Sequence, residues 1–156
     1  MSLTHHLAQI NIARLAAPLD HPSIADFVAQ IPAVNELAEA SEGFVWRLQS
    51  AEGDATSIPY CDDPRVIVNM SVWESIEALK AFTYRSQHLQ VFRDRAKWFE
   101  KMDLPHYCLW WVPVRYAPSL AEGKERLEHY QRYGSAPEAF WFSRWYPAPT
   151  EDALEV

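Results

Sequence analysis

The sequence predicts one domain of the α+β class, in which an antiparallel sheet carries helices on one face. Two observations support this. Short segments with a two-residue hydrophobic period alternate with longer segments in which apolar residues recur every three or four positions. The 156 residues, 49% hydrophobic and 13% aromatic, suffice for one compact core. No repeat or linker divides the chain, so we expect the domain at 1–146 and a tail at 147–156.

The first expected strand covers 7–15, where polar and apolar residues alternate in the sequence LAQINIARL. A turn follows, and we expect Ser23 to cap a helix that ends at Gly43. Apolar residues keep helical spacing there, namely Phe27, Ile31, Val34, Leu37 and Ala38. Pro32 interrupts this pattern at a cost of about 3 kcal/mol inside a helix, so we expect a kink or a late start.

Two further strands are expected at 44–49 (FVWRLQ) and 66–73 (VIVNMSVW), since both are rich in β-branched and aromatic residues. The loop over 51–65 that joins them is long for a hairpin, and such loops are functional or mobile. The longest expected helix covers 75–101, and Leu104 and Pro105 stop it.

The C-terminal third adds a strand at 107–114 (YCLWWVPV), a polar amphipathic helix at 119–133 that ends at Gly134, and a short strand at 140–146 (FWFSRWY). The order is strand, helix, strand, strand, helix, strand, followed by one more helix and strand. This is the ferredoxin-like pattern with a C-terminal extension.

Two of the expected strands are apolar on both faces, over 66–70 and 107–114. A sheet with helices on one face only would expose the other apolar face to water. A second copy of the chain is the simplest cover, so we expect a homodimer whose sheets face each other.

Five stretches of this sequence resemble a known family: LAQINIARL, ELAEASEGFVWRLQ, VNMSVWESIEALKAFTYRSQH, KWFEKMDLPHYCLWWVP and ERLEHYQRYGSAPEAF. They look like the bacterial family called domain of unknown function 3291, of the dimeric α+β barrel superfamily. The resemblance covers about residues 7–142 and implies that fold. It implies no single activity, because the superfamily includes cofactor-independent monooxygenases, haem-degrading enzymes, chlorite dismutases and members without known activity.

The expected long helix carries the most informative local pattern. One stripe is spaced four, three, four and three residues apart, and it consists of Tyr84, His88, Val91, Arg95 and Trp98. Arg85 and Phe92 lie on the stripe beside it. His88 is the first candidate for proton transfer, because histidine titrates near pH 6.5 and small-ligand sites combine apolar walls with few polar groups. The alternative is a structural histidine that is bonded to Tyr84 or to a backbone carbonyl.

Further candidates lie on the expected sheet. Arg47 and Asn69 occupy neighbouring strands and could stabilise developing negative charge, with His88 as the acid or base; structural hydrogen bonding is the alternative. The predicted ligand contacts are Tyr84, Arg85, Phe92, Arg95, Trp46, Trp73 and Trp111. The tryptophans could stack a planar ligand, although core packing and a dimer interface are the favoured explanation for them.

Several classes of function are excluded by composition and motif. The formal charge of −7 opposes binding to nucleic acid or to an anionic membrane, and no apolar run approaches the roughly 20 residues of a membrane span. No phosphate loop or dinucleotide turn is present, and no residue spacing predicts a metal site. Cys61 and Cys108 are expected to be free thiols in a cytoplasmic protein, because no export signal is visible.

Three functions remain. The first is a cofactor-independent, monooxygenase-like enzyme that acts on a small hydrophobic or aromatic substrate between the sheet and the 75–101 helix. The second is a noncatalytic dimer that binds an apolar ligand in the same place. The third is a haem-binding protein with His88 as axial ligand, for which no attachment motif is present.

Overall fold

A long N-terminal strand is the centre of the sheet. The structure, a computed structural model, describes residues 4–50, 53–87, 89 and 93–149. Strand β1 (His5–Leu15) pairs antiparallel with β3 (Val66–Trp73) along one edge. Along its other edge it pairs first with β5 (Tyr107–Pro113) and then with β4 (Phe99–Glu100). Strand β2 (Phe44–Arg47) pairs with β3 at the outside.

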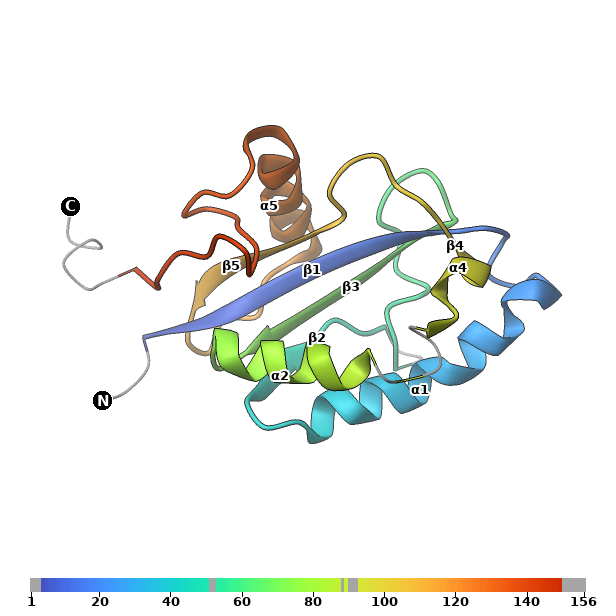
Figure 1. Ribbon diagram of the computed structural model, residues 1–156, viewed down its shortest axis with the longest axis horizontal. Coiled ribbons are helices and arrows are strands. Elements are labelled where there is room, and N and C mark those ends of the chain that lie inside the picture. The colour runs from blue at the N-terminus through green and yellow to red at the C-terminus, as the bar shows by residue number, and fades with distance from the viewer. Residues whose placement is uncertain (1–3, 51–52, 88, 90–92, 150–156) are drawn as a thin grey trace.

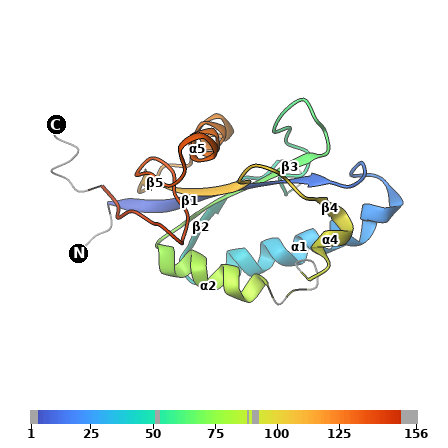
Figure 2. The same ribbon diagram turned by 45° about the horizontal axis from the view of Figure 1, so that its top comes forward.

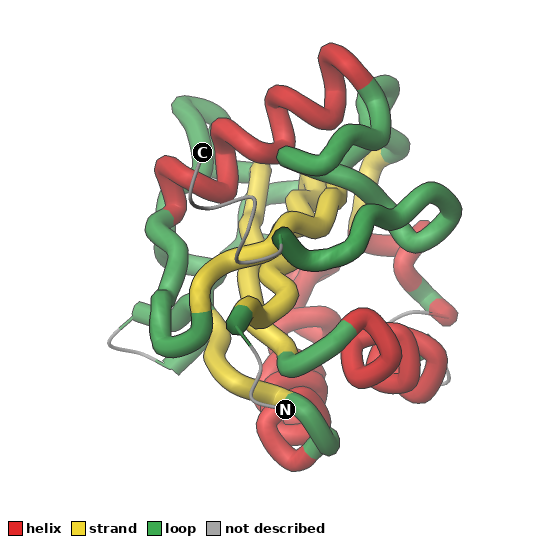
Figure 3. Tube along the Cα trace, turned by 90° about the vertical axis from the view of Figure 1, so that its left-hand side faces the viewer, coloured by secondary structure: helices red, strands yellow, loops and turns green. Residues whose placement is uncertain are grey.

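The helices lie on both sides of this sheet (Figures 1–3). The short helix η1 (Pro22–Ile24) leads into α1 (Ala25–Ala40), which lies on one face together with α2 (Ile76–Ser86) and α4 (Arg95–Trp98). Helix α5 (Leu120–Tyr133) lies on the opposite face. The order β1-α1-β2-β3-α2-β5, with β1 and β3 in the middle, is ferredoxin-like, so the predicted fold class is confirmed.

Serine residues begin two of the helices. Ser75 Oγ accepts the Ala78 N–H at 3.1 Å, and Ser119 Oγ accepts the Glu122 N–H at 3.1 Å. The predicted cap at Ser23 is wrong, because His21 is the cap of η1 and its Nδ1 accepts the Ser23 N–H. Helix α1 runs through Pro32, so it does not start late.

The predicted helix at 75–101 is wrong at its C-terminal end, where the short helix α4 (Arg95–Trp98) is followed by a strand. Helix α2 ends at Ser86, and Phe99–Glu100 form strand β4 opposite Arg14 and Leu15. The physical reason is the length of β1. Its register with β5 runs only to Asn11, so the last residues of β1 have an open edge that β4 fills. Tertiary pairing thus overrides a pattern with helical spacing.

The predicted strand at 140–146 is also wrong. Phe140 forms one isolated bridge with Leu109, in which each N–H bonds to the other's carbonyl at 2.8 and 2.9 Å, and Trp141 forms another with Arg144. Phe140 is fully buried. The aromatic residues of this segment therefore reflect packing against the edge of β5 and not a continuous ladder.

Helix α5 covers the second apolar face of the sheet. Leu127 packs with buried residues from three strands, namely Ala8, Ile10, Ile12, Val68, Met70, Val72, Cys108, Trp110 and Val112. Gly123 permits this approach, since a Cβ there would lie 2.8 Å from Met70 Sδ and 2.9 Å from Ile10 Cδ1. The argument that a second copy must cover this face is therefore wrong, because the chain's own extension covers it.

Candidate functional site

A cavity of about 400 Å³ lies between the sheet and helices α1 and α2. Its walls are mainly apolar and come from α1 and α2, with Phe27, Ile31, Val34, Leu79 and Phe82 among them. A cavity of this size with few polar groups is typical of a small-molecule site.

The floor of the cavity is polar. Gln9 lies opposite Ser71, and Asn11 lies opposite Asn69, in the antiparallel register of β1 and β3. Gln9 and Ser71 are buried, Asn11 is half-buried and Asn69 is exposed. Because side chains alternate along a strand, the residues between these four face α5 and form the apolar core on that side. Two short runs of alternating sequence thus place four polar groups together.

The four floor residues form a continuous hydrogen-bond network. Gln9 Nε2 donates to Asn69 Oδ1 and to Ser71 Oγ, each at 2.7 Å. Asn11 Nδ2 donates to Gln9 Oε1 at 2.9 Å and to Asn69 Oδ1 at 3.2 Å. Behind the floor, the buried Trp73 donates its indole N–H to Ser71 Oγ at 2.8 Å.

This network leaves hydrogen-bond donors unused. Ser71 Oγ accepts two hydrogen bonds, which fills its acceptor capacity and leaves its O–H as a donor. The Nδ2 group of Asn69 has no acceptor among the residues that the structure describes, and Asn11 Oδ1 receives no donor from them. The floor therefore offers donors from two residues and one amide acceptor to a ligand oxygen.

One end of the cavity carries a histidine. His106, Tyr107, Phe99, Arg95 and Trp141 line this end. The ring of His106 lies edge-to-face on Tyr107 at 4.8 Å. Burial lowers the pKa of His106, because an apolar environment disfavours the imidazolium form. The imidazole is therefore neutral near pH 7.

Three of the residues predicted from sequence line the cavity: Arg47, Asn69 and Arg95. Arg47 is bound to Glu39, with Nε and Nη2 each 2.9 Å from Oε1. Its guanidinium is therefore held by α1, whereas the Nδ2 group of Asn69 has no acceptor among the described residues.

Five other predicted residues that the structure describes do not line the cavity. Tyr84 and Arg85 are exposed on α2, with Tyr84 66% exposed. Trp46 packs with the core beneath α5. Trp73 and Trp111 lie in the packed layer around the cavity, and Trp111 Nε1 donates to the Tyr146 carbonyl at 2.8 Å.

His88 and Phe92, the first catalytic candidate and a predicted ligand contact, lie outside the described residues.

Sequence reasoning missed Gln9, Asn11, Ser71 and His106. A signal for the first three exists in the sequence. Polar residues occur two apart in LAQINIARL and again in VIVNMSVW, each on the strand face that also carries large apolar residues. No comparable signal marks His106, because its place depends on how the segment before β5 meets β1.

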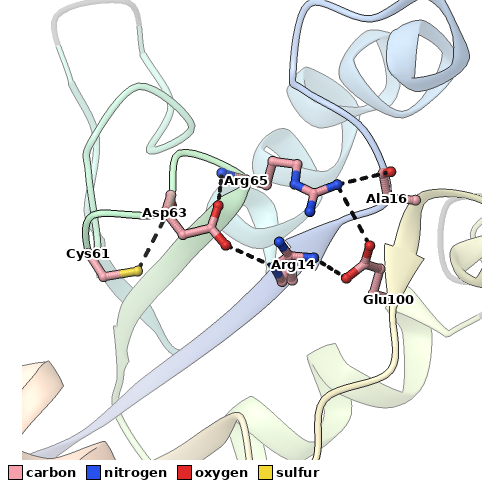
Figure 4. Close-up of polar contacts among 6 residues, drawn as sticks. All are labelled: Arg14, Ala16, Cys61, Asp63, Arg65 and Glu100. Carbon is pink, nitrogen blue, oxygen red and sulfur yellow. Dashed lines mark hydrogen bonds and ion pairs between the residues drawn. The ribbon is translucent and has the colours of Figure 1, made fainter.

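The 53–65 segment also contributes to the cavity, through Asp54, Ala55 and Thr56. An ionic cluster holds the end of this segment against the sheet (Figure 4). Arg14 Nε lies 2.8 Å from Asp63 Oδ2, and Arg14 also pairs with Glu100. Arg65 Nη1 lies 3.7 Å from Glu100 Oε1. The cluster ties this segment to β1 and β4.

No group of three or more His, Cys, Asp or Glu side chains among the described residues is placed to hold a metal ion. None of the helices in that part of the chain is both long and apolar enough to cross a membrane.

The fold and the cavity together define a ferredoxin-like α+β protein with an apolar chamber above a polar sheet floor. The chain belongs to the DUF3291 family, a domain of unknown function, whose model matches residues 6–155. The family suggested by the sequence motifs is thereby confirmed. No curated protein matches the chain.

Three solved structures are similar to the chain. PA3566 from Pseudomonas aeruginosa is 13% identical, over 75% of this chain and 100% of that one, with a TM-score of 0.46. A candidate antibiotic biosynthesis monooxygenase from Nitrosomonas europaea is 16% identical, over 76% and 99%, with a TM-score of 0.48. SnoaB, a cofactor-independent oxygenase from Streptomyces nogalater, is 14% identical, over 74% and 97%, with a TM-score of 0.39. Values this low carry no conclusion about what this chain does.

Proposed function

We propose that the chain binds a small aromatic molecule with one hydroxyl or carbonyl oxygen and oxidises it with O₂ without a cofactor. The observation that carries the proposal is the pair of unused donors on the cavity floor, the Asn69 amide and the Ser71 hydroxyl. The apolar walls contact the rings of the ligand, and the two floor groups donate hydrogen bonds to its oxygen.

The donors favour a ligand oxygen that carries negative charge. Hydrogen bonds to an ionised acceptor are about twice as strong as those between neutral groups, and apolar walls strengthen them further. A bound naphthol or similar phenol would therefore lose its proton more readily than in water. The resulting anion is electron-rich at ring carbon, where it can react directly with O₂.

The reaction needs no external reductant. For 1-naphthol, one oxygen atom of O₂ becomes the second carbonyl oxygen of 1,4-naphthoquinone and the other leaves as water. The substrate supplies both electron pairs. Arg47 and Asn69 remain proposed contacts of the developing anion, and His88, which lies outside the described residues, remains the sequence-based alternative for the proton transfer.

Binding of 1-naphthol and of naphthalene, measured by equilibrium dialysis, tests the site. We expect the naphthol to bind more tightly, because only it has an oxygen for the floor donors. Asn69→Leu should reduce this preference by about fivefold to tenfold, the value of one or two hydrogen bonds. Asn35→Leu is the matched control, because Asn35 lines the wall from α1 and its loss should leave the preference intact. Equal preference in both variants contradicts the floor as the binding site.

Oxygen consumption separates the enzyme from the alternative function. An enzyme should consume one O₂ for each 1-naphthol converted to 1,4-naphthoquinone. A chain that binds 1-naphthol with the expected preference and consumes no O₂ is the noncatalytic binding protein. Haem is not part of the proposal, and its sequence-based axial ligand, His88, lies outside the described residues.

A further inference from the structure

We infer that His106 is the proton acceptor of the cavity, taking the hydroxyl proton of a phenolic ligand whose oxygen binds Asn69 and Ser71. The inference rests on the proposed function, which it deepens by naming the base and the ionisable class of ligand. The sequence pattern had given this role to His88.

The position of His106 is fixed by the backbone. Its carbonyl accepts the Ile12 N–H at 2.8 Å, directly beside the paired residues Asn11 and Tyr107. His106 precedes β5, and its side chain lines the cavity beside Tyr107, the residue that pairs with the floor residue Asn11. The ring is oriented by Tyr107, at 4.8 Å and an interplanar angle of 84°.

The ring nitrogens of His106 are available. Neither has a hydrogen-bond partner among the residues that the structure describes. The ring is half-buried, and burial holds its pKa below the usual range for histidine. A neutral imidazole then presents an unshared electron pair to the cavity.

The other ionisable groups that line the cavity are unsuited to this role. Arg47 and Arg95 stay protonated at any physiological pH and cannot accept a proton. Asp54 accepts the Thr56 N–H at 2.8 Å and the Thr56 hydroxyl at 2.5 Å. Tyr107 carries a phenolic O–H, which is a hydrogen-bond donor and a weak base. Among the described groups that line the cavity, His106 is therefore the neutral nitrogen base, whereas the Asp54 carboxylate is engaged by Thr56 through Oδ1.

The proton transfer is balanced within the site. The ligand O–H bond breaks and an N–H bond forms on His106, so a neutral pair becomes a phenolate and an imidazolium. Asn69 and Ser71 donate to the phenolate oxygen. Asn11 Oδ1 can accept a hydrogen bond from the hydroxyl before transfer, but an amide oxygen does not take the proton.

A probe whose ionisation is visible tests this role. The anion of 4-nitrophenol absorbs at longer wavelength than the neutral phenol, so its spectrum reports the proton directly. Below the pKa of the free probe, at pH 6, we expect the wild-type protein to bind it as the anion. His106→Gln should still bind it but show about tenfold less anion, which corresponds to one unit in the pKa of the bound probe.

His129→Gln is the matched control, because His129 lies on α5 in a separate surface groove and should leave the anion band unchanged. A second measurement needs no variant: ¹⁵N signals of assigned histidine side chains in the wild-type protein should move from neutral to imidazolium for His106 alone when the probe binds.

Two results would overturn the inference, and they differ in what they leave standing. If the probe binds with sensitivity to Asn69→Leu while His106 stays neutral, His106 is not the acceptor and the proposed function survives. If the wild-type protein binds neither 4-nitrophenol nor 1-naphthol, the proposed function fails and the inference fails with it.

Discussion

The hydroxyl of Ser71 depends on a residue that never reaches the cavity. Trp73 is fully buried, stacks on Phe82 with ring centroids 4.9 Å apart, and donates its N–H to Ser71 Oγ. This bond fills an acceptor site that would otherwise let the serine accept from a ligand. Trp73 is thus a positioning residue, because it sets Ser71 as a donor.

Replacement of Trp73 by Phe should weaken the preference of the cavity for ligands that carry an oxygen atom. We expect the 1-naphthol preference over naphthalene to fall several-fold and the free energy of unfolding to fall by about 1–3 kcal/mol, because a buried ring becomes smaller and loses a hydrogen bond. Equilibrium dialysis and urea denaturation measure the two effects. A variant that loses stability but keeps the full preference would show that the indole N–H does not orient Ser71.

The two cysteines should differ sharply in reactivity. Cys61 is exposed, whereas Cys108 is fully buried in β5 and burial raises the pKa of its thiol to about 12. At pH 8 we expect iodoacetamide to modify Cys61 alone in the native protein, since the thiolate is the reactive form. Mass spectrometry counts the labels. Rapid modification of both thiols without denaturant would contradict the burial of Cys108.

At the residue scale, part of the site could be predicted from sequence. Asn69 and Arg47 were identified because a polar residue on a largely apolar strand invites explanation. Tyr84 and Arg85 were not found at the cavity, because α2 turns a different side toward it, the side that carries Phe82, Thr83 and Ser86. His106 could not be identified, since its neighbour Ile12 is distant in the sequence.

Ion pairs and hydrogen bonds hold the end of the 53–65 segment, which contributes to the cavity wall. A hydrogen bond from the Arg65 backbone N–H, followed by one from the Arg14 side chain, holds the pKa of Asp63 below its usual range. Because the pKa of the Asp63 carboxyl is lower in the folded state, its ionised form stabilises the protein at pH values above the pKa of the same carboxyl in the unfolded chain. This stabilisation is lost as the pH falls through the folded-state pKa.

Asp63→Asn should therefore lower the Tm at pH 7, because the amide keeps an acceptor for Arg65 N–H but loses the charge that pairs with Arg14. We expect the difference in Tm between wild type and variant to shrink as the pH falls below the usual carboxyl range. Differential scanning calorimetry across pH measures it. A difference that stays constant at acid pH would show that the carboxylate charge is not what stabilises the segment.

At the element scale, the predicted strands at 66–73 and 107–114 were close to the observed ones, because their apolar and β-branched residues have no competing pattern. The 75–101 helix was wrong at Phe99–Glu100, whose apolar spacing fits both a helix and a strand. Only the open edge of β1 decides between them.

The stability of the whole fold depends on how closely α5 approaches the sheet at Gly123. Gly123→Val should destabilise the fold by about 1–3 kcal/mol, because the new side chain meets Met70 and Ile10 and has no room. Urea denaturation measures the loss. Ala121→Val is the control, since Ala121 is exposed on the same helix. Equal losses in both variants would mean that β-branching in the helix, not contact with the sheet, is responsible.

The homodimer remains a prediction about the whole molecule, without its original support. Since α5 covers the second face, a monomer exposes no uncovered apolar sheet there. Sedimentation at micromolar concentration decides the question. We expect a dimer of the 18.0 kDa chain, and a stable monomer would contradict the prediction.

The alternation along β1 also protects the chain against assembling wrongly. Its cavity face carries Gln9 and Asn11, and its other face carries Ile10 and Ile12 under α5. A slip of one residue in the pairing of β1 would turn both amides into the apolar layer and both isoleucines onto the polar floor. The slipped register would therefore be unfavourable on both faces of the strand. Misaligned chains would have buried amides without partners, which makes the slipped register less stable than the native one. The floor residues on β1 that form the proposed ligand site therefore also fix the register of this strand during folding, before any ligand is present.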